Sequence, residues 1–195
     1  WIVKDLLAEY FVFDEELYYS ILPTATQYAR NAIFSGLMPV KIAEQFPDFW
    51  LEEDSEESKN LHEAPLIQAH LERFRRTDSF SYHKIYESRV AEKLMQDFTA
   101  LTTSKLNIFV LNFVDMLSHA RTEDKMIREL AQTEAAYRSL TRSWFQHSAT
   151  LDLFRKIAES GYKVILTTDH GTIRVDSPLK VVGDRHTNTN LRYKA

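Results

Sequence analysis

Two aspartate–histidine pairs stand out in the sequence because their side chains could hold a divalent metal ion. Asp115 and His119 are four residues apart, so one turn of helix would place both on the same face. Asp169 and His170 are adjacent and precede Gly171, which allows a tight turn that brings both side chains together. A carboxylate with an imidazole suits zinc or manganese, whereas calcium prefers oxygen ligands alone. Either pair alone is common on a protein surface, but two pairs that each follow an apolar segment favour a metal site.

Thr26 lies where a helix is expected to begin, a place where free N–H groups and the helix dipole attract phosphate. Its hydroxyl becomes a nucleophile when a metal or a base withdraws the proton. Arg30 follows one helical turn later and could bind the same phosphate through its guanidinium. Two alternatives stay open here: Thr26 could cap the helix, and Arg30 could face solvent.

Three short apolar segments are predicted as strands, and each is followed by one of these reactive groups. They cover residues 15–22, 106–114 and 162–168. The second and third are rich in branched and aromatic side chains, which is typical of strands buried on both faces of a parallel sheet. The helical stretch 124–160 between them predicts a right-handed crossover. We therefore expect an α/β fold with a mostly parallel sheet, helices on both of its faces, and the reactive groups together at one edge.

Further helices are predicted where apolar residues recur at helical spacing. They lie near residues 2–10, 26–37, 66–74 and 90–101, and the stretch 124–160 is expected to break near residues 147–150. Gly36 and Gly161 stand where two of the helices should end.

The composition excludes several classes of protein. The chain has 195 residues with 44% hydrophobic and 27% charged residues, which is typical of a globular domain. Because it contains no cysteine, disulfide scaffolds and thiolate zinc sites are excluded. Its four glycines form no phosphate-binding glycine motif, and a net charge of -4 argues against general binding of duplex nucleic acid. The longest apolar run is too short for a membrane span, so we expect a cytoplasmic protein without membrane contact.

Two charged clusters have no predicted catalytic role. The acidic residues 52–57 are typical of a solvated loop. Arg73, Arg75 and Arg76 gather at a predicted helix end, which is usually a solvated face.

Three longer motifs contain the residues singled out above. They read Pro23-Thr-Ala-Thr-Gln-Tyr-Ala-Arg-Asn, Asn112-Phe-Val-Asp-Met-Leu-Ser-His-Ala-Arg and Thr167-Thr-Asp-His-Gly-Thr-Ile-Arg-Val. With these motifs the chain resembles the PglZ domain of the alkaline phosphatase superfamily over essentially its whole length. It looks most like the effector domain of PorX-type response regulators of Bacteroidetes. The resemblance implies an alkaline-phosphatase-like fold, with about residues 40–105 as an insertion or cap-like region.

The resemblance also implies roles for individual residues. Thr26, rather than Thr24, would be the nucleophile between two divalent ions, usually zinc, with manganese as the alternative. Asp169 and His170 would bind one ion, and Asp115 and His119 the other. The family has a further aspartate ligand upstream and a further histidine downstream, which we expect outside these 195 residues. His186 is the only local candidate for the latter.

The function implied is a metal-dependent phosphodiesterase that acts on linear or cyclic oligonucleotides through a phosphothreonine. It would be the effector domain of a two-component regulator of type IX secretion, with a histidine kinase and a sigma factor as partners and with homodimerisation as an open question. One alternative is a non-catalytic signalling module that docks a sigma factor or another regulator. Another is a phosphomonoesterase or sulfatase on the same scaffold.

Overall fold

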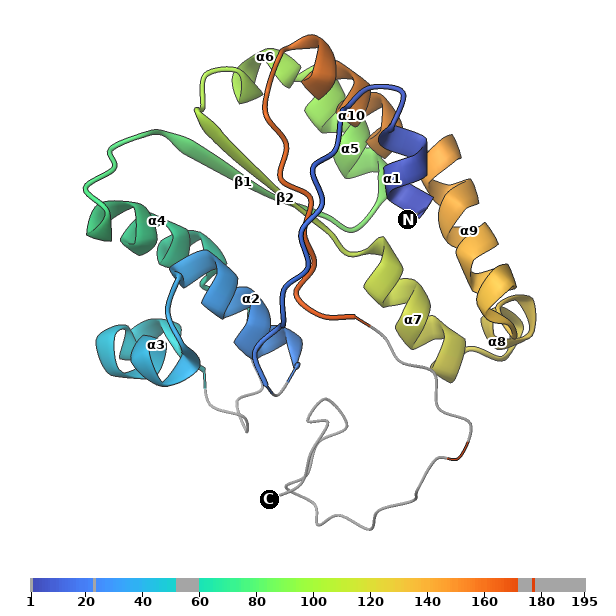
Figure 1. The fold of residues 1–195 in the computed structure, drawn as a ribbon, viewed down its shortest axis with the longest axis horizontal. Coiled ribbons are helices and arrows are strands. Elements are labelled where there is room, and N and C mark those ends of the chain that lie inside the picture. Colours follow the sequence, from blue (N-terminus) through green and yellow to red (C-terminus); the bar gives the residue numbers. More distant parts are fainter. Residues whose placement is uncertain (1, 23, 52–59, 172–176, 178–195) are drawn as a thin grey trace. The chain divides into compact units, whose positions relative to one another are not determined.

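The computed structural model describes residues 2–22, 24–51, 60–171 and 177. They form a mixed α/β fold that is mostly helical (Figure 1). The chain divides into two compact units, which are described separately here. The first unit contains residues 1–15 and 78–164, and the second contains residues 16–77 and 165–195. None of the helices in the described ranges has the length and apolarity that crossing a lipid bilayer requires.

A pair of parallel strands lies at the centre of the first unit. Strand β1 (Phe80–Ile85) pairs with β2 (Leu106–Leu111), in a register that runs from Phe80 opposite Leu106 to Ile85 opposite Leu111. Parallel strands need a crossover connection, and helices α5 (Ser88–Gln96) and α6 (Phe98–Leu101) provide it here. Strand β1 falls within residues 40–105, the predicted insertion, whose status stays a prediction.

Helices cover one face of this strand pair within the first unit. Ile85, Ala91, Leu101 and Leu153 are buried together, and Phe109 and Leu111 of β2 pack against them. These side chains join the strands to α5, α6 and α10 (Ala149–Glu159). Burial of such side chains is the main stabilising contribution, at about 1.5–3 kcal/mol for each large one. The expected cover on the second face stays a prediction.

A second cluster in this unit joins the N-terminal helix to the helices near the end of the unit. Leu7 of α1 (Ile2–Leu7) packs with Phe145, Leu151 and Phe154. Phe145 belongs to α9 (Glu134–His147), and the other two belong to α10. The predicted break near residues 147–150 is confirmed, because α9 ends at His147 and Ser148 has an extended backbone. Helices α7 (Phe113–Glu123) and α8 (Lys125–Leu130) precede α9.

The second unit is built on α2 (Thr26–Ser35), α3 (Pro39–Gln45), the short helix η1 (Pro47–Phe49) and α4 (Glu63–Arg73). The predicted end of α2 is confirmed, because Gly36 follows it in the left-handed region with φ 63°. The imidazole of His70 donates from Nδ1 to the Phe34 carbonyl at 2.9 Å, and Arg73 donates to the Ser35 carbonyl at 2.6 Å. Side chains of α4 therefore satisfy the last carbonyls of α2, which have no partner within their own helix.

The strand predictions for residues 15–22 and 162–168 were wrong, since neither segment forms a strand. The two segments run without main-chain pairing, and side-chain hydroxyls connect them instead: Tyr18 bonds to Thr167 and Thr168, and Ser20 donates to the Asp169 carbonyl. Leu17 and Tyr19, which alternate with these two, are almost fully exposed. Apolar alternation shows strand tendency, but a strand forms only where a second backbone supplies the hydrogen bonds.

The boundary predicted after residue 114 was also wrong. Strand β2 ends at Leu111, and its residues are partly exposed rather than buried on both faces. Helix α7 already begins at Phe113, so Asp115 lies in the first helical turn instead of at the strand end. The sequence hides this change, because apolar residues continue on both sides of Asn112, the residue that separates the strand from the helix. The acidic residues 52–57 lie outside the described residues.

Candidate active site

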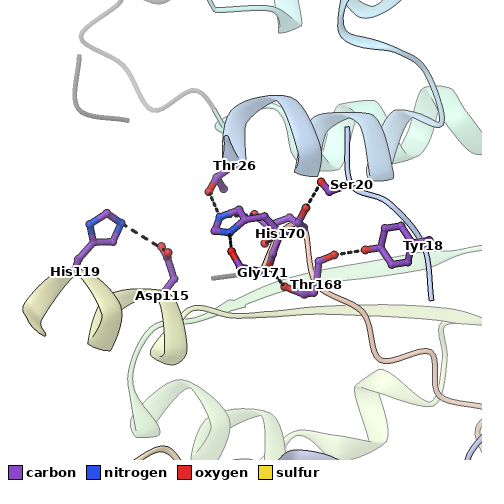
Figure 2. A network of polar contacts seen from close by, with 9 residues as sticks. Tyr18, Ser20, Thr26, Asp115, His119, Thr168, His170 and Gly171 are labelled. Carbon is purple, nitrogen blue, oxygen red and sulfur yellow. Dashed lines mark hydrogen bonds and ion pairs between the residues drawn. The ribbon is translucent and has the colours of Figure 1, made fainter. Parts of the chain in front are cut away.

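The N-terminus of α2 presents Thr26 as its first residue (Figure 2). The residue that precedes it, Ala25, is the N-cap, with an extended backbone and no side chain that could accept a hydrogen bond. Thr26 therefore does not cap its own helix, and its hydroxyl is directed elsewhere. The cap alternative raised by the sequence is wrong for this residue.

The hydroxyl of Thr26 points at the imidazole of His170 (Figure 2). Thr26 Oγ1 lies 3.2 Å from His170 Nε2. On the other side of the ring, Nδ1 lies 3.1 Å from the carbonyl oxygen of Gly171. A carbonyl only accepts hydrogen bonds, so Nδ1 carries the proton and Nε2 of the neutral ring has a free lone pair. That lone pair faces the threonine, where it can accept the hydroxyl proton or bind a metal.

Asp169 places its carboxylate beside the same imidazole. Its Oδ1 accepts from the backbone N–H of His170 at 3.1 Å, and its Oδ2 lies 3.7 Å from His170 Nε2. Only 10% of the His170 side chain and 20% of the Asp169 side chain are exposed. The prediction that a turn brings these adjacent side chains together is confirmed, and the turn is also tied by the Thr168 hydroxyl, which donates to the His170 carbonyl at 2.8 Å.

Tyr18 and Ser20 hold this turn from the neighbouring segment (Figure 2). The hydroxyl of Ser20 donates to the carbonyl of Asp169, and that of Tyr18 donates to the carbonyl of Thr168. Sequence reasoning missed both residues. The signal that could have found them is their spacing of two residues, because an extended chain directs every second side chain toward the same side.

Arg30 lies one turn after Thr26, as predicted, and its guanidinium is paired with a buried glutamate. Arg30 Nη2 donates to Glu63 Oε2 at 2.7 Å, where the side chains are 15% and 1% exposed. Glu63 begins α4, and no local signal in the sequence identifies it as a buried residue. The pair connects α2 to α4 and holds Arg30 on the face of α2 that also carries Thr26. The predicted phosphate contact of Arg30 stays a prediction.

The second pair, Asp115 and His119, lies on α7 in the first unit. One helical turn brings His119 Nε2 to 3.7 Å from Asp115 Oδ1, which confirms that they share a helix face. More than half of each side chain is exposed. Because the two pairs belong to different units, the joint site predicted from the sequence stays a prediction.

The opposite face of α7 is held against α9 by three contacts that run in reverse order along the two helices. The ring of Phe113 stacks on Trp144 with centroids 4.1 Å apart. The hydroxyl of Tyr137 donates to the Val114 carbonyl at 3.1 Å. Arg121 Nη1 donates to Glu134 Oε1 at 3.0 Å. The helices are therefore antiparallel, and the Asp115–His119 face is turned away from α9.

The hydroxyl of Tyr137 is sensitive to the charges around α7. Burial raises the pKa of Tyr137 from its usual value, and a hydrogen bond with Ser118 and the charge of Arg121 oppose that shift. The carboxylates of Glu134 and Asp115 add to the increase in pKa. Tyr137 thus stays protonated near neutral pH and can donate to the helix that carries the metal-binding candidates.

The donor atoms of both pairs fit a zinc-type ion. Zinc–ligand distances of about 2.0–2.1 Å and tetrahedral angles separate two ligand atoms by about 3.3 Å. The observed separations, 3.2 Å from Thr26 Oγ1 to His170 Nε2 and 3.7 Å within each Asp–His pair, are close to that spacing. No cluster of three or more His, Asp, Glu or Cys side chains that could hold a metal is found among the described residues. His186 lies outside them.

The other histidines have structural contacts. His70 caps α2, His147 bonds through Nδ1 to the Ser143 carbonyl at 2.8 Å, and His62 stacks on Phe49. His83 stacks on Phe109, its partner in the parallel register, and burial lowers the pKa of His83 below its usual value. We predict from the sequence that none of these four histidines is a metal ligand, and this stays a prediction.

A mixed α/β fold that carries aspartate–histidine donor pairs is compatible with an alkaline-phosphatase-like domain, a class whose members typically bind metal ions. A family model confirms this class and makes it specific: residues 2–194 match the PglZ family, described as the BREX system PglZ alkaline phosphatase-like domain. The chain belongs to the PglZ family. The match extends over nearly the whole chain, and it does not support the narrower likeness to PorX-type response regulators. No match was found among curated proteins.

Proposed function

We propose that this domain is a metal-dependent phosphodiesterase that cleaves linear or cyclic oligonucleotides, with Thr26 as the nucleophile. Membership of the PglZ family supports phosphoesterase-type chemistry. The single observation that carries the role of Thr26 is the 3.2 Å separation between its Oγ1 and Nε2 of His170. A threonine needs such a neighbour, because its hydroxyl alone is a poor nucleophile.

The reaction proceeds in two displacements at phosphorus. The hydroxyl of Thr26 gives up its proton and Oγ1 forms a bond to phosphorus, while the bond from phosphorus to the leaving oxygen breaks. The leaving oxygen takes up a proton and departs as an alcohol, and the enzyme becomes a phosphothreonine ester. Water then forms the second bond to phosphorus, the bond to Oγ1 breaks, and the hydroxyl of Thr26 regains a proton. The N-terminus of α2 favours the negative charge of the phosphoryl oxygens, because its first N–H groups have no partner within the helix.

Two groups of residues would hold the metal ions. Thr26, Asp169 and His170 provide one set of donors, and Asp115 and His119 provide another. When bound, the ions supply Lewis acidity toward the phosphoryl oxygens and lower the pKa of the hydroxyl that attacks. The Gly171 carbonyl fixes the His170 tautomer, and the hydrogen bond from the His170 amide orients Asp169. These contacts preorganise the donors before any ion binds.

Replacement of the nucleophile gives the direct test. We expect Thr26→Ala to abolish turnover of a phosphodiester while the bound metal, measured by elemental analysis, stays largely unchanged. Thr26→Ser should retain part of the activity, because a serine hydroxyl can attack in the same way. Thr24→Ala is the matched control, since Thr24 lies in the same motif just before the helix, and it should retain most of the activity. Full activity in the Thr26→Ala variant would remove this residue from the mechanism.

A comparison of substrates tests the kind of ester that is cleaved. We expect the rate on bis(p-nitrophenyl) phosphate to exceed the rates on p-nitrophenyl phosphate and p-nitrophenyl sulfate. A faster rate on the monoester or the sulfate would assign the alternative chemistry of the same scaffold. Metal binding without turnover of any of the three would instead favour the docking module.

The regulatory context is also part of this proposal and rests on the motif resemblance alone. In this proposed context the domain is the effector of a two-component response regulator that controls type IX secretion. The partners of that regulator would be a histidine kinase and a sigma factor. A phosphoacceptor domain in the parent protein, with a change of diesterase rate on its phosphorylation, would support this context. An unchanged rate would contradict it.

A further inference from the structure

The C-terminal end of α4 in the second unit exposes a short cationic and aromatic segment. Its residues are Arg73, Phe74, Arg75 and Arg76, called here the arginine tip, and all four are exposed. Within this segment no acidic side chain interrupts the positive charge. Glu72, which precedes it, is engaged by Gln68 Nε2 at 2.6 Å on the same helix.

The backbone of the arginine tip has a conformation that arginine does not favour. Arg75 has φ 54°, and it is the one residue other than glycine with a positive φ in the described part of the chain. The amide of Arg75 bonds to the Glu72 carbonyl at 2.8 Å, and that of Arg76 bonds to the Leu71 carbonyl at 2.9 Å. This is the hydrogen-bond pattern of a Schellman cap, in which glycine is the usual residue at the position of Arg75. Backbone strain of this kind clusters at functional sites, so the side chain of Arg75 is a candidate for a function.

Phe74 adds an exposed aromatic ring to this cationic surface. It is 66% exposed, although burial would be favourable for so large an apolar side chain. The Arg73 guanidinium lies 5.5 Å from its ring centroid, and the His70 ring lies 5.4 Å away. Arg73 also donates to the Ser35 carbonyl, so it anchors the tip to α2. The tip therefore combines an exposed aromatic ring with the exposed guanidinium of Arg75.

We propose that the arginine tip binds single-stranded nucleic acid. Phe74 would stack on a base, and Arg75 would bind an adjacent phosphate. Aromatic rings interleaved with cationic groups bind single strands because a base offers a flat face and each linkage carries a charge. A duplex lacks this feature, since its bases are already stacked on one another. The inference rests on the proposed function only in that the strand held here would be the substrate cleaved at Thr26.

Fluorescence anisotropy with a labelled twelve-residue oligothymidylate tests the tip. The purified protein carries Thr26→Ala, so that the strand is not cleaved during the measurement. Arg75→Gly is the informative variant, because it removes the charge and at the same time relieves the positive φ. We expect weaker binding by about threefold or more, and a slope of log K against log salt that is smaller by about 0.7 for one lost phosphate contact. The melting temperature should be unchanged or higher.

Two further variants separate stacking from charge. Phe74→Leu keeps an apolar side chain but removes the aromatic face, and it should weaken binding by about fivefold or more without a change of salt slope. Arg142→Gln removes an exposed arginine from α9 in the first unit and should leave binding unchanged. Unchanged affinity in both Arg75→Gly and Phe74→Leu would overturn the proposal. Equal binding of a polyglutamate peptide with the same number of charges would overturn it as well, because it would show attraction without recognition of bases.

The outcome for the tip can be distinguished from the outcome for the active site. Turnover of bis(p-nitrophenyl) phosphate, which is too small to reach a remote surface, should be the same with and without Arg75→Gly. If the unmodified protein does not cleave this diester, the proposed function fails while the binding result still stands. If it cleaves the diester but the tip variants bind oligothymidylate normally, only the inference about the tip fails.

Discussion

The hydroxyl of Tyr137 donates to the carbonyl of Val114 at 3.1 Å, and it thereby connects α9 to the first turn of α7. That turn carries Asp115, the first member of one metal-binding pair. The same tyrosine hydroxyl also bonds with Ser118, one residue before His119. A single side chain therefore restrains the helix on the face opposite to the candidate ligands.

Tyr137→Phe tests this restraint. The substitution keeps the ring against Arg121, whose guanidinium lies 5.2 Å from the ring centroid, and removes only the hydroxyl. We expect a loss of about 0.5–1.5 kcal/mol in the free energy of unfolding. Zinc affinity, measured by competition with a chromophoric chelator, should also decrease because the pair is held less firmly. Equal zinc affinity in the two proteins would show that the contact is structural only.

The buried ion pair between Arg30 and Glu63 predicts a strongly non-additive pair of substitutions. Arg30→Met or Glu63→Leu alone leaves a charge buried without its partner, and each should cost about 3–5 kcal/mol in the free energy of unfolding. The double variant should be much less destabilised than the sum, because no charge then remains. Urea unfolding of the four proteins measures this coupling. Additive losses would mean that the two side chains do not interact in solution.

The same double variant tests whether Arg30 also binds phosphate. If it does, the stable double variant should have a raised KM for the diester or a lowered kcat. Unchanged kinetics would restrict Arg30 to its structural contact with Glu63.

Gly36 is expected to tolerate no side chain. Its φ is 63°, and a Cβ atom there would lie 2.6 Å from the His70 ring and 3.0 Å from Arg73 Nη2. Gly36→Ala should destabilise the protein by about 1–3 kcal/mol, measured by urea unfolding. Gly161→Ala is the matched control, since Gly161 has φ 73° but nothing within 4 Å of the added atom. If Gly36→Ala costs no more than the control, contact with His70 does not limit this position.

His83 predicts a dependence of stability on pH. Burial lowers the pKa of His83 from 6.5, and its Nε2 atom is buried without a hydrogen-bond partner among the described residues. The unfolded chain therefore binds a proton more readily than the folded one. The stabilisation is complete above about pH 6.5 and is lost as the pH falls through the lower pKa of the folded state.

His83→Phe checks this assignment, because phenylalanine can keep the stack on Phe109 but cannot be protonated. Thermal unfolding between pH 7.5 and 5 should show a smaller loss of stability in the variant than in the unmodified protein. Identical pH profiles would assign the acid sensitivity to other groups.

Helix ends and contacts between residues a few positions apart could be predicted from the sequence, because they depend on residues that are close together in the chain. The helix from Thr26 to Ser35 is determined by apolar spacing and ends at a glycine, and the break at Ser148 was visible as a gap in the helical pattern. The meeting of Asp115 with His119 needs only one helical turn, and that of Asp169 with His170 needs only one bend. Spacing along the chain is enough to predict such contacts.

Long-range contacts could not be predicted in the same way. The partner of Thr26, His170, is 144 residues away, and Glu63 is 33 residues from Arg30. Apolar alternation in residues 15–22 and 162–168 gave no information on whether a second backbone would pair with them, and the predicted strands were wrong for that reason. The types of residue that could do chemistry, and their order, are properties of the sequence itself. The side chain that faces each of them was decided only when the chain folded, because hydrogen bonds and burial depend on distance in space.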